Sequence, residues 1–244
     1  MVPTFKIIIP ARYQSSRFPG KPLIKINGIS MIERVWKKCI QAIPKKDVHV
    51  ATDSKVIYDF CIENSMNTIM TPECLTGSDR VYQASLKLEA DIFINVQGDE
   101  PLISPEDIKS VISFSAKSPQ AVINAMCQIT EEADFQSSAI PKVVVNINNN
   151  LLYMSRSAIP LTKNKTMVTA YKQVCIYAFP KETLKRFAEQ ATKTPLESIE
   201  DIEILRFLEI GVPVKMIEVS QSSISVDYPE DVKRVENALN SNHK

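Results

Sequence analysis

The sequence predicts an α/β protein built on a mainly parallel sheet with helices on both faces. Short β-rich runs at 5–9, 48–52 and 91–96 alternate with segments whose apolar residues recur at helical spacing. Strands that alternate with helices in this βαβαβ order form a sheet covered on both sides. No repeat, low-complexity tract or linker interrupts the 244 residues, so a single domain spanning 1–244 is the simplest organisation.

The first helix is predicted from its N-terminus as well as from its periodicity. Ser30 stands as N-cap and Glu33 as its capping-box partner, ahead of apolar residues at helical spacing from Met31 to Ile40. The same kinds of signal then predict, in order, a strand at 48–52, a helix at 55–64, a short strand at 67–70, a helix at about 79–90 and a strand at 91–96.

The second half of the chain adds a small β-rich insertion near 140–180. Runs at 142–147 and 151–155 flank the turn 148–150, whose asparagines tolerate the left-handed conformation that a hairpin needs. The remaining elements are a helix beginning at Ser104 and Pro105, a strand at 121–129, a strand at 173–179, a helix from Pro180, a capped helix at 198–210, a strand at 212–219 and a final helix at 229–239.

The composition excludes several classes of protein. With 44% hydrophobic residues the chain is not disordered, and no apolar run approaches the roughly 18 residues of a membrane helix. The N-terminus lacks the layout of a signal peptide, which indicates a soluble, cytoplasmic protein. The 29 basic and 28 acidic side chains nearly cancel, so we expect no nucleic-acid or membrane partner and, instead, a small-molecule partner.

Histidine and cysteine usage narrows the chemistry further. Only His49 and His243 are present, which nearly excludes Ser-His-Asp, Cys-His and histidine-ligated zinc sites. The five cysteines form an odd set without C-x-x-C spacing. This pattern favours reduced thiols that fill the core over disulfides or a zinc site.

A basic loop at 10–22 follows the first predicted strand. It places Arg12, Arg17 and Lys21 at the carboxyl end of a strand, where open α/β sheets bind ligands. Arginine offers forked donors and lysine a point charge, while Gly20 lets backbone N–H groups approach an anion. The loop therefore predicts a triphosphate site, although it is not a Walker loop. A solvated basic loop is the alternative.

Two carboxylates also follow predicted strands. Asp99 comes after the strand at 91–96, beside the predicted phosphate loop, where a carboxylate suits Mg²⁺ because the ion completes its shell with phosphate oxygens and water. A β-turn in which Asp99 bonds its own backbone is the alternative. Asp227 follows the strand at 212–219, and from the residues alone capping of the final helix is the better interpretation of it.

Three further sites carry weaker signals. Ser78 and Arg80 lie where a glycine turn meets a predicted helix N-terminus, which suits an anion or the edge of a nucleotide, unless Ser78 is simply the cap. Arg156 could fork onto a substrate carboxylate, and Glu203 could bond sugar hydroxyls. A surface arginine and a solvated acidic helix start are equally good interpretations of that last pair.

The resemblance to a known family rests on these segments, in order: IIIPARYQSSRFPGKPL, ATDS, TGSDR, INVQGDEPLI, YMSRSAIP, KQVCIYAF, LESIEDIEILRFLEIG and VDYPEDVKRVE. Over about 220 residues they resemble the 3-deoxy-manno-octulosonate cytidylyltransferases. The resemblance implies a Rossmann-like nucleotidyltransferase fold, usually a homodimer, with the insertion near 140–180 serving the sugar site and dimerisation. It also implies an enzyme that uses Mg²⁺ to join CTP to an acidic 2-keto sugar, releases pyrophosphate and supplies lipopolysaccharide synthesis.

The resemblance implies roles for individual residues as well. Asp99 and Asp227 would bind Mg²⁺, which replaces capping as the role of Asp227, and with Arg12 and Lys21 they form the catalytic set. The implied nucleotide site comprises Ala11, Arg12, Ser15, Lys21, Ser78, Arg80 and Gln97. The implied sugar site comprises Gln97, Arg156, Gln173, Tyr177 and Glu203.

Two positions of the implied sugar pocket depart from the family's usual pattern. Gln173 stands where the family usually has histidine, and Ile204 where it usually has glutamine. The sequence therefore leaves an 8-amino octulosonate or another acidic 2-keto sugar open as the substrate. The alternative from a different class is a non-catalytic nucleotide-binding domain, which the pairing of Asp99 with Asp227 disfavours.

Overall fold

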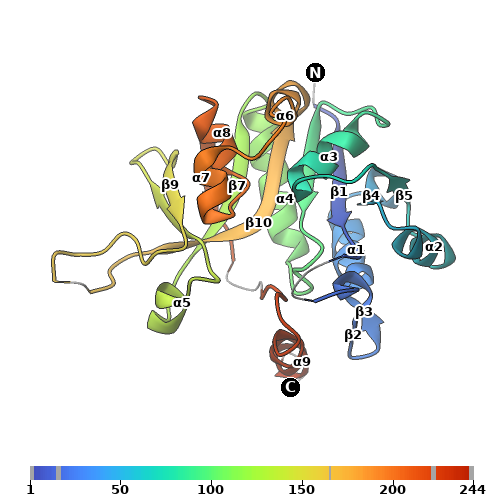
Figure 1. Ribbon diagram of the computed structural model, residues 1–244, viewed down its shortest axis with the longest axis horizontal. Coiled ribbons are helices and arrows are strands. Elements are labelled where there is room, and N and C mark those ends of the chain that lie inside the picture. Colours follow the sequence, from blue (N-terminus) through green and yellow to red (C-terminus); the bar gives the residue numbers. More distant parts are fainter. Residues whose placement is uncertain (1–2, 15–17, 165, 221–223, 242–244) are drawn as a thin grey trace.

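The computed structural model describes residues 3–14, 18–164, 166–220 and 224–241. Among these residues, a nine-stranded sheet has the order β11-β7-β10-β6-β1-β4-β5, with β8 paired to β10 and β9 paired to β8 (Figure 1). Its strands are β1 (Phe5–Ala11), β4 (Val48–Thr52), β5 (Thr68–Met70), β6 (Ile92–Val96), β7 (Val122–Gln128), β8 (Lys142–Val145), β9 (Leu151–Ser155), β10 (Tyr171–Pro180) and β11 (Val214–Glu218). A separate hairpin consists of β2 (Lys25–Ile26) and β3 (Ile29–Ser30).

The parallel core of this sheet confirms the sequence prediction. Strand β1 pairs in parallel with β4 and β6, β4 with β5, and β11 with β7. Strand β10 lies antiparallel between β6 and β7, so the sheet is mixed. The predicted hairpin is present as β8 and β9, and Asn149 in its turn has a φ of 57°, the left-handed conformation expected there.

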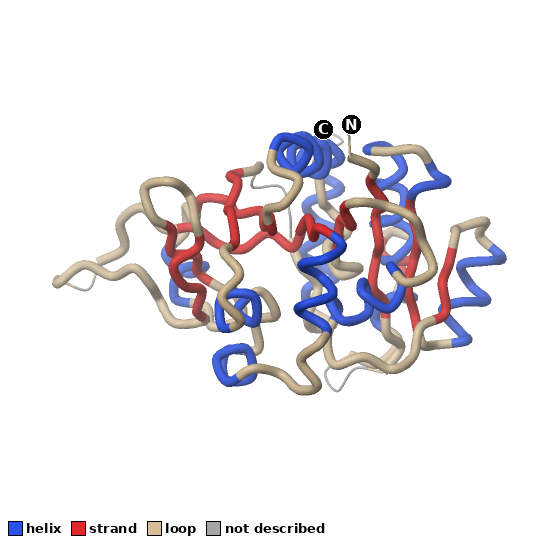
Figure 2. Tube along the Cα trace, turned by 90° about the horizontal axis from the view of Figure 1, so that it is seen from above, coloured by secondary structure: helices blue, strands red, loops and turns tan. Residues whose placement is uncertain are grey.

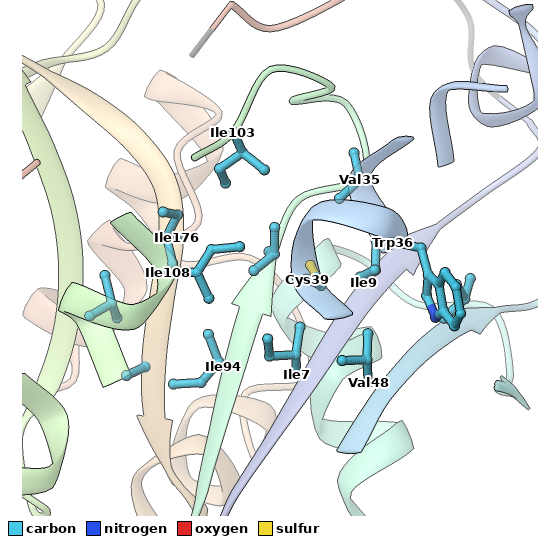
Figure 3. Packing of buried hydrophobic residues seen from close by; sticks show 14 of the residues in the cluster. Ile7, Ile9, Val35, Trp36, Cys39, Val48, Ile94, Ile103, Ile108 and Ile176 are labelled. Carbon is cyan, nitrogen blue, oxygen red and sulfur yellow. The ribbon is translucent and has the colours of Figure 1, made fainter. Parts of the chain in front are cut away.

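Helices cover both faces of the sheet, as predicted. They are α1 (Met31–Ala42), α2 (Lys55–Glu63), α3 (Gly77–Ser85), α4 (Pro105–Lys117), α5 (Glu132–Gln136), α6 (Lys181–Ala188), α7 (Pro195–Glu200), α8 (Leu205–Glu209) and α9 (Asp231–Ser241). Side chains alternate along β1, so Ile7 and Ile9 pack with residues of α1 and α4 (Figure 3), whereas Ile8 packs with residues of α3 and α6. Each face therefore carries its own apolar core.

Three predicted helices have different boundaries in the structure. The predicted helix at 198–210 was wrong as a single element: α7 and α8 are separate, and Asp201 between them has a φ of 51°. Helix α3 begins at Gly77 because Thr76, rather than Ser78, is its N-cap and accepts a hydrogen bond from the N–H of Asp79. Helix α9 begins at Asp231 rather than at 229, and α5 was not predicted.

The C-terminal helix α9 packs beside the β2–β3 hairpin rather than on the sheet. Val235 on α9 is buried with Ile26, Met31 and Val226 in a small apolar cluster. This packing brings the segment around residue 226 next to the chain that follows β1. Two segments from opposite ends of the sequence thereby meet at one edge of the molecule.

The region between β9 and β10 leaves the body of the protein. Figure 2 shows this loop projecting from one end of the molecule. All five cysteines are unpaired; Cys39, Cys61 and Cys127 are buried, as predicted, whereas Cys74 and Cys175 are only partly buried. No helix within the described residues combines the length and the apolar character needed to cross a membrane.

Candidate active site

A cavity of about 250 Å³ lies at the carboxyl ends of β1 and β6, the edge of the sheet where the sequence predicts the ligand. Its wall combines the end of β1 and the following loop, the start of α3, the turn after β6 and the turn between α7 and α8. The lining residues are Pro10, Ala11, Arg12, Lys21, Pro22, Met31, Cys74, Leu75, Thr76, Gly77, Arg80, Gln97, Gly98, Asp99, Lys193, Asp201 and Glu203.

Gly20, near the end of the basic loop at 10–22, is hydrogen-bonded back to the beginning of that loop. Gly20 donates its N–H to the carbonyl oxygen of Tyr13 at 2.9 Å and has a φ of 71°, a conformation that glycine adopts without strain. Lys21 follows in the first turn of a short 3-10 helix, and Arg12 lies exposed in the cavity wall. Two predicted members of the loop lie outside the described residues: Ser15 and Arg17.

Lys21 lies between the two carboxylates predicted to bind metal. Its Nζ is 3.0 Å from Asp99 Oδ2 and 3.6 Å from Asp227 Oδ1, and it donates to the carbonyl oxygen of Val226 at 2.9 Å. Val226 in turn donates its N–H to the carbonyl oxygen of Asp99 at 2.9 Å. Burial lowers the pKa of Lys21, but the two carboxylates raise it by more, so the side chain is an ammonium ion.

Asp231, rather than Asp227, binds the backbone at the start of α9. Its Oδ2 accepts hydrogen bonds from the N–H groups of Asp227 and Tyr228, each at 3.0 Å. Burial raises the pKa of Asp231, but these two hydrogen bonds help to lower it by more. The Asp227 carboxylate faces Lys21 instead, an arrangement that favours the metal assignment over capping for Asp227.

A carboxylate of this chain is bound at the N-terminus of α3. Glu203 accepts hydrogen bonds from the N–H of Gly77 at 2.9 Å and from that of Ser78 at 2.8 Å, since unpaired N–H groups favour an anion there. Burial raises the pKa of Glu203, although the hydrogen bonds from Ser78 and Gly77 act to lower it. Glu203 also lines the cavity, so the predicted sugar site and the predicted nucleotide turn are in direct contact.

Arg80 on α3 and Gln97 after β6 form the neighbouring part of the cavity wall. Arg80 is nearly buried and is held by an ion pair with Asp53 at 2.7 Å and a hydrogen bond to Thr71 Oγ1 at 2.7 Å. The side chain of Gln97 packs against Gly77, where a Cβ atom would lie 2.7 Å from Gln97 Nε2. Position 77 therefore has no room for a side chain while Gln97 keeps this place.

Arg156 lies outside the cavity lining. Its guanidinium donates to backbone carbonyl oxygens on both sides, at 3.1 Å to Ser138, 2.5 Å to Glu200 and 3.0 Å to Asp201. The Glu200 carboxylate completes the cluster by accepting the N–H of Arg156 at 2.9 Å. In this structure Arg156 holds the turn between α7 and α8, and its contact with a sugar carboxylate stays a prediction.

The other predicted sugar residues lie on β10 and in the core. Gln173 donates through Nε2 to Asn124 Oδ1 at 2.9 Å. Tyr177 is buried, and burial, with the Cys175 thiol and the Glu203 carboxylate, raises its pKa well above its ordinary value. Ile204 is buried in an apolar core cluster and is not among the residues that line the cavity.

The sequence did not predict Lys193 in this wall, or the role of Arg206, which is buried behind α3 and does not line the cavity. Lys193 and Asp201 form an ion pair at 2.7 Å, and both line the cavity. Arg206 is fully buried and forms ion pairs with Asp79 and Glu197, which join α8 to α3 and α7. An arginine within an otherwise apolar helical run was the signal that could have indicated Arg206.

The comparison with known families covers most of the chain. The model of the cytidylyltransferase family matches residues 6–219, a span that contains the basic loop, Asp99 and Glu203. The chain belongs to the cytidylyltransferase family. The predicted enzyme class, a nucleotidyltransferase, is thereby confirmed.

Relatives of this cytidylyltransferase carry names for two related sugars. The 3-deoxy-manno-octulosonate cytidylyltransferase of Escherichia coli is 35% identical over 230 residues, 94% of this chain and 93% of its own. The 8-amino-3,8-dideoxy-manno-octulosonate cytidylyltransferase of Shewanella baltica strain OS155 is 37% identical over 239 residues, 96% of this chain and 97% of its own. A solved structure of CMP:2-keto-3-deoxy-manno-octonic acid synthetase complexed with CTP has a TM-score of 0.90 and 34% identity, covering 98% of this chain and 99% of that one. The predicted fold is confirmed by that likeness.

The donors present in this cytidylyltransferase fit a magnesium ion. Asp99 and Asp227 direct carboxylate oxygens at one ammonium group, and their side chains keep 29% and 34% of their exposure. In the part of the chain that the structure describes, no cluster of three or more His, Cys, Asp or Glu side chains is placed to enclose a metal. Two carboxylates completed by phosphate oxygens and water are the usual protein setting for Mg²⁺.

Proposed function

We propose that this cytidylyltransferase transfers CMP from CTP to the anomeric hydroxyl of 3-deoxy-manno-octulosonate, or a close relative of that sugar, and releases pyrophosphate. The observation that carries the proposal is the meeting of Lys21, Asp99 and Asp227 at the carboxyl edge of the sheet, where Lys21 and Asp99 line the cavity and Asp227 lies 3.6 Å from Lys21. The names of the relatives and of the CTP-bound structure support the choice of nucleotide and sugar.

The reaction needs positioning and charge more than a reactive side chain. The anomeric hydroxyl oxygen forms a bond to the α-phosphorus of CTP and loses its proton to solvent, while the bond from that phosphorus to the pyrophosphate oxygen breaks. Arg12 and Lys21 would hold the phosphates, and Ser78, Arg80 and Gln97 the nucleoside. When bound at Asp99 and Asp227, Mg²⁺ would supply positive charge for the phosphate oxygens as negative charge develops on them.

Glu203 would lie at the boundary between the proposed sugar site and the proposed nucleotide site. Its carboxylate lines the cavity and is held by N–H groups of α3, so its direction is fixed before a ligand arrives. Arg156 fixes the neighbouring turn through carbonyl oxygens. Gln97, Tyr177 and Gln173 remain the other proposed sugar contacts.

The identity of the sugar is tested by pyrophosphate release from CTP with Mg²⁺, measured across a panel of acidic 2-keto sugars. The panel contains 3-deoxy-manno-octulosonate, its 8-amino analogue and a nonulosonate, and we expect the highest kcat/KM with one of the two octulosonates. The Gln173→His variant is expected to shift the ratio between those two, because Gln173 stands where the family usually has a histidine of the implied sugar site. Release with none of the sugars would contradict the proposal and favour a non-catalytic nucleotide-binding protein.

We also propose a homodimer formed through the β8–β9 hairpin and the loop after it, in a cytoplasmic enzyme whose product supplies lipopolysaccharide synthesis. Leu152 on β9 is 58% exposed and Ile147 in the turn is fully exposed, an arrangement that favours a protein contact. The variant Leu152→Asp is expected to sediment as a monomer. Its control is Leu86→Asp, since Leu86 is 60% exposed at the end of α3, and this variant should sediment like the wild type. A wild-type monomer, or a Leu152→Asp dimer, would contradict this assignment.

A further inference from the structure

The ammonium of Lys21 is engaged by the residues that the proposed function assigns to the metal. It lies 3.0 Å from Asp99 Oδ2, 3.6 Å from Asp227 Oδ1 and 2.9 Å from the carbonyl oxygen of Val226. Two of the three N–H donors of the ammonium are used in hydrogen bonds to Asp99 and Val226, and Asp227 at 3.6 Å is an ion-pair neighbour beyond hydrogen-bonding distance. A phosphate oxygen that approaches Lys21 therefore competes with both carboxylates for its charge.

The same contacts oppose the entry of a metal ion. A divalent cation on the oxygens of Asp99 and Asp227 would lie within a few ångströms of the ammonium, where like charges repel strongly. The backbone at Lys21 is fixed by the 3-10 helix and by the hydrogen bond between Gly20 and Tyr13. The flexible four-carbon stem of the lysine is free to carry the charge elsewhere without moving that backbone.

We propose that Lys21 is an exchangeable placeholder for the metal. In the nucleotide-free protein it neutralises Asp99 and Asp227, and it leaves them for the phosphates when Mg²⁺ and CTP enter together. The inference rests on the proposed function and gives Lys21 a second role besides its contact with the phosphates. Because both ligands require the same movement of one side chain, each raises the affinity of the protein for the other, and the metal alone binds weakly.

The test measures Mg²⁺ binding to the nucleotide-free protein by isothermal titration calorimetry. The Lys21→Met variant is expected to bind Mg²⁺ at least about tenfold more tightly than the wild type, because a hydrogen-bonded charge that competed for the site is gone. The same variant should bind CTP more weakly. Lys25→Met is the matched control, since Lys25 is exposed on β2, and its metal affinity should equal that of the wild type.

A second measurement, the effect of Mg²⁺ on the melting temperature, is made on two different variants of Lys21. In Lys21→Met and in Lys21→Gln, added Mg²⁺ should raise the melting temperature by more than it does in the wild type, because the ion binds only the folded protein. A phosphate-binding role alone would leave both metal readouts unchanged. Metal affinity in Lys21→Met equal to or weaker than that of the wild type overturns the exchange.

The variant Lys21→Met/Asp99→Asn separates the exchange from the proposed metal site. Loss of the tightened Mg²⁺ binding in this double variant supports both the exchange of Lys21 and the metal site at Asp99. Tightened binding that survives Asp99→Asn would show that the ion binds elsewhere, which overturns the metal assignment itself. Absence of tightening, together with loss of turnover in Asp99→Asn, overturns the exchange and leaves the proposed function standing.

Discussion

Asp99→Asn is expected to lower kcat by about a thousandfold or more while leaving the protein folded. The carboxylate of Asp99 lies in the cavity and belongs to the pair of hard oxygen donors around Lys21. Losing one such ligand should cost on the order of 4 kcal/mol of transition-state stabilisation, which corresponds to that factor in rate. Asp227→Asn should have a similar effect. The measurement is pyrophosphate release at saturating CTP, sugar and Mg²⁺, with circular dichroism to confirm the fold.

The matched control for this prediction is Asp47→Asn. Asp47 also forms a partly buried ion pair with a lysine, 2.6 Å from Lys6, but it does not line the cavity. Removing its charge should leave kcat within about twofold of the wild type, since exposed or half-exposed pairs contribute little to stability. A kcat for Asp99→Asn within tenfold of the wild type at saturating Mg²⁺ would remove Asp99 from the metal site.

The parts of the fold that the sequence predicts well depend on neighbours a few residues apart. Ser30 accepts the N–H of Glu33, which is the N-cap half of the predicted capping box, while the Glu33 carboxylate forms an ion pair with Lys37. Asn149 adopts the left-handed turn conformation that asparagine tolerates. The alternation of Ile7, Ile8 and Ile9 between the two faces follows from the geometry of any strand. In each case the interaction that determines the conformation lies within a few residues, so the local sequence is sufficient to predict that conformation.

The break between α7 and α8 has causes far along the chain. The apolar spacing through 198–210 continues across it, which is why a single helix is the natural prediction. In the structure, Arg156 binds the carbonyl oxygens of Glu200 and Asp201, and Glu203 turns towards the N-terminus of α3. Tertiary hydrogen bonds therefore override local periodicity at this point, and no local signal reports them.

The candidate site likewise has a part that the local sequence predicts and a part that depends on tertiary packing. Lys21 and Asp99 could be proposed individually, since each follows a strand whose carboxyl end meets the same edge of the sheet. Their contact with each other and with Asp227 depends on how α9 packs, which the sequence does not show. The choice between capping and metal binding for Asp227 likewise depended on Asp231 holding the backbone at the start of α9.

Arg206→Met is expected to reduce the free energy of unfolding by about 3–5 kcal/mol. Arg206 and Glu197 are both fully buried, and the guanidinium forms two hydrogen bonds of 2.7 Å to that carboxylate. It forms two more to Asp79, at 2.8 and 3.1 Å, and lies 3.8 Å above the ring of Phe187. Removing one partner of a buried pair leaves the other charge uncompensated, which is the source of the loss.

The measurement is urea-induced unfolding, with Arg186→Met as the control. Arg186 is an exposed arginine on α6, so the same substitution there should change the free energy of unfolding by no more than about 0.5 kcal/mol. The double variant Glu197→Gln/Arg206→Met should be more stable than the sum of the two single losses predicts, because the uncompensated charge is then absent. Additive losses would contradict the assignment of a coupled buried pair.

The consequence of Arg206→Met for activity follows from Asp79, which lies in the first turn of α3. Arg206 and Glu203 hold that turn by two separate ties, one through the Asp79 carboxylate and one through the N–H groups of Gly77 and Ser78. Without the contact between Arg206 and Asp79, the part of the cavity wall that carries Arg80 is held less rigidly. At temperatures below the melting temperature, KM for CTP should therefore rise several-fold, while kcat changes less. An unchanged KM alongside the full loss of stability would restrict Arg206 to holding the core, and would show that Glu203 alone is sufficient to position α3.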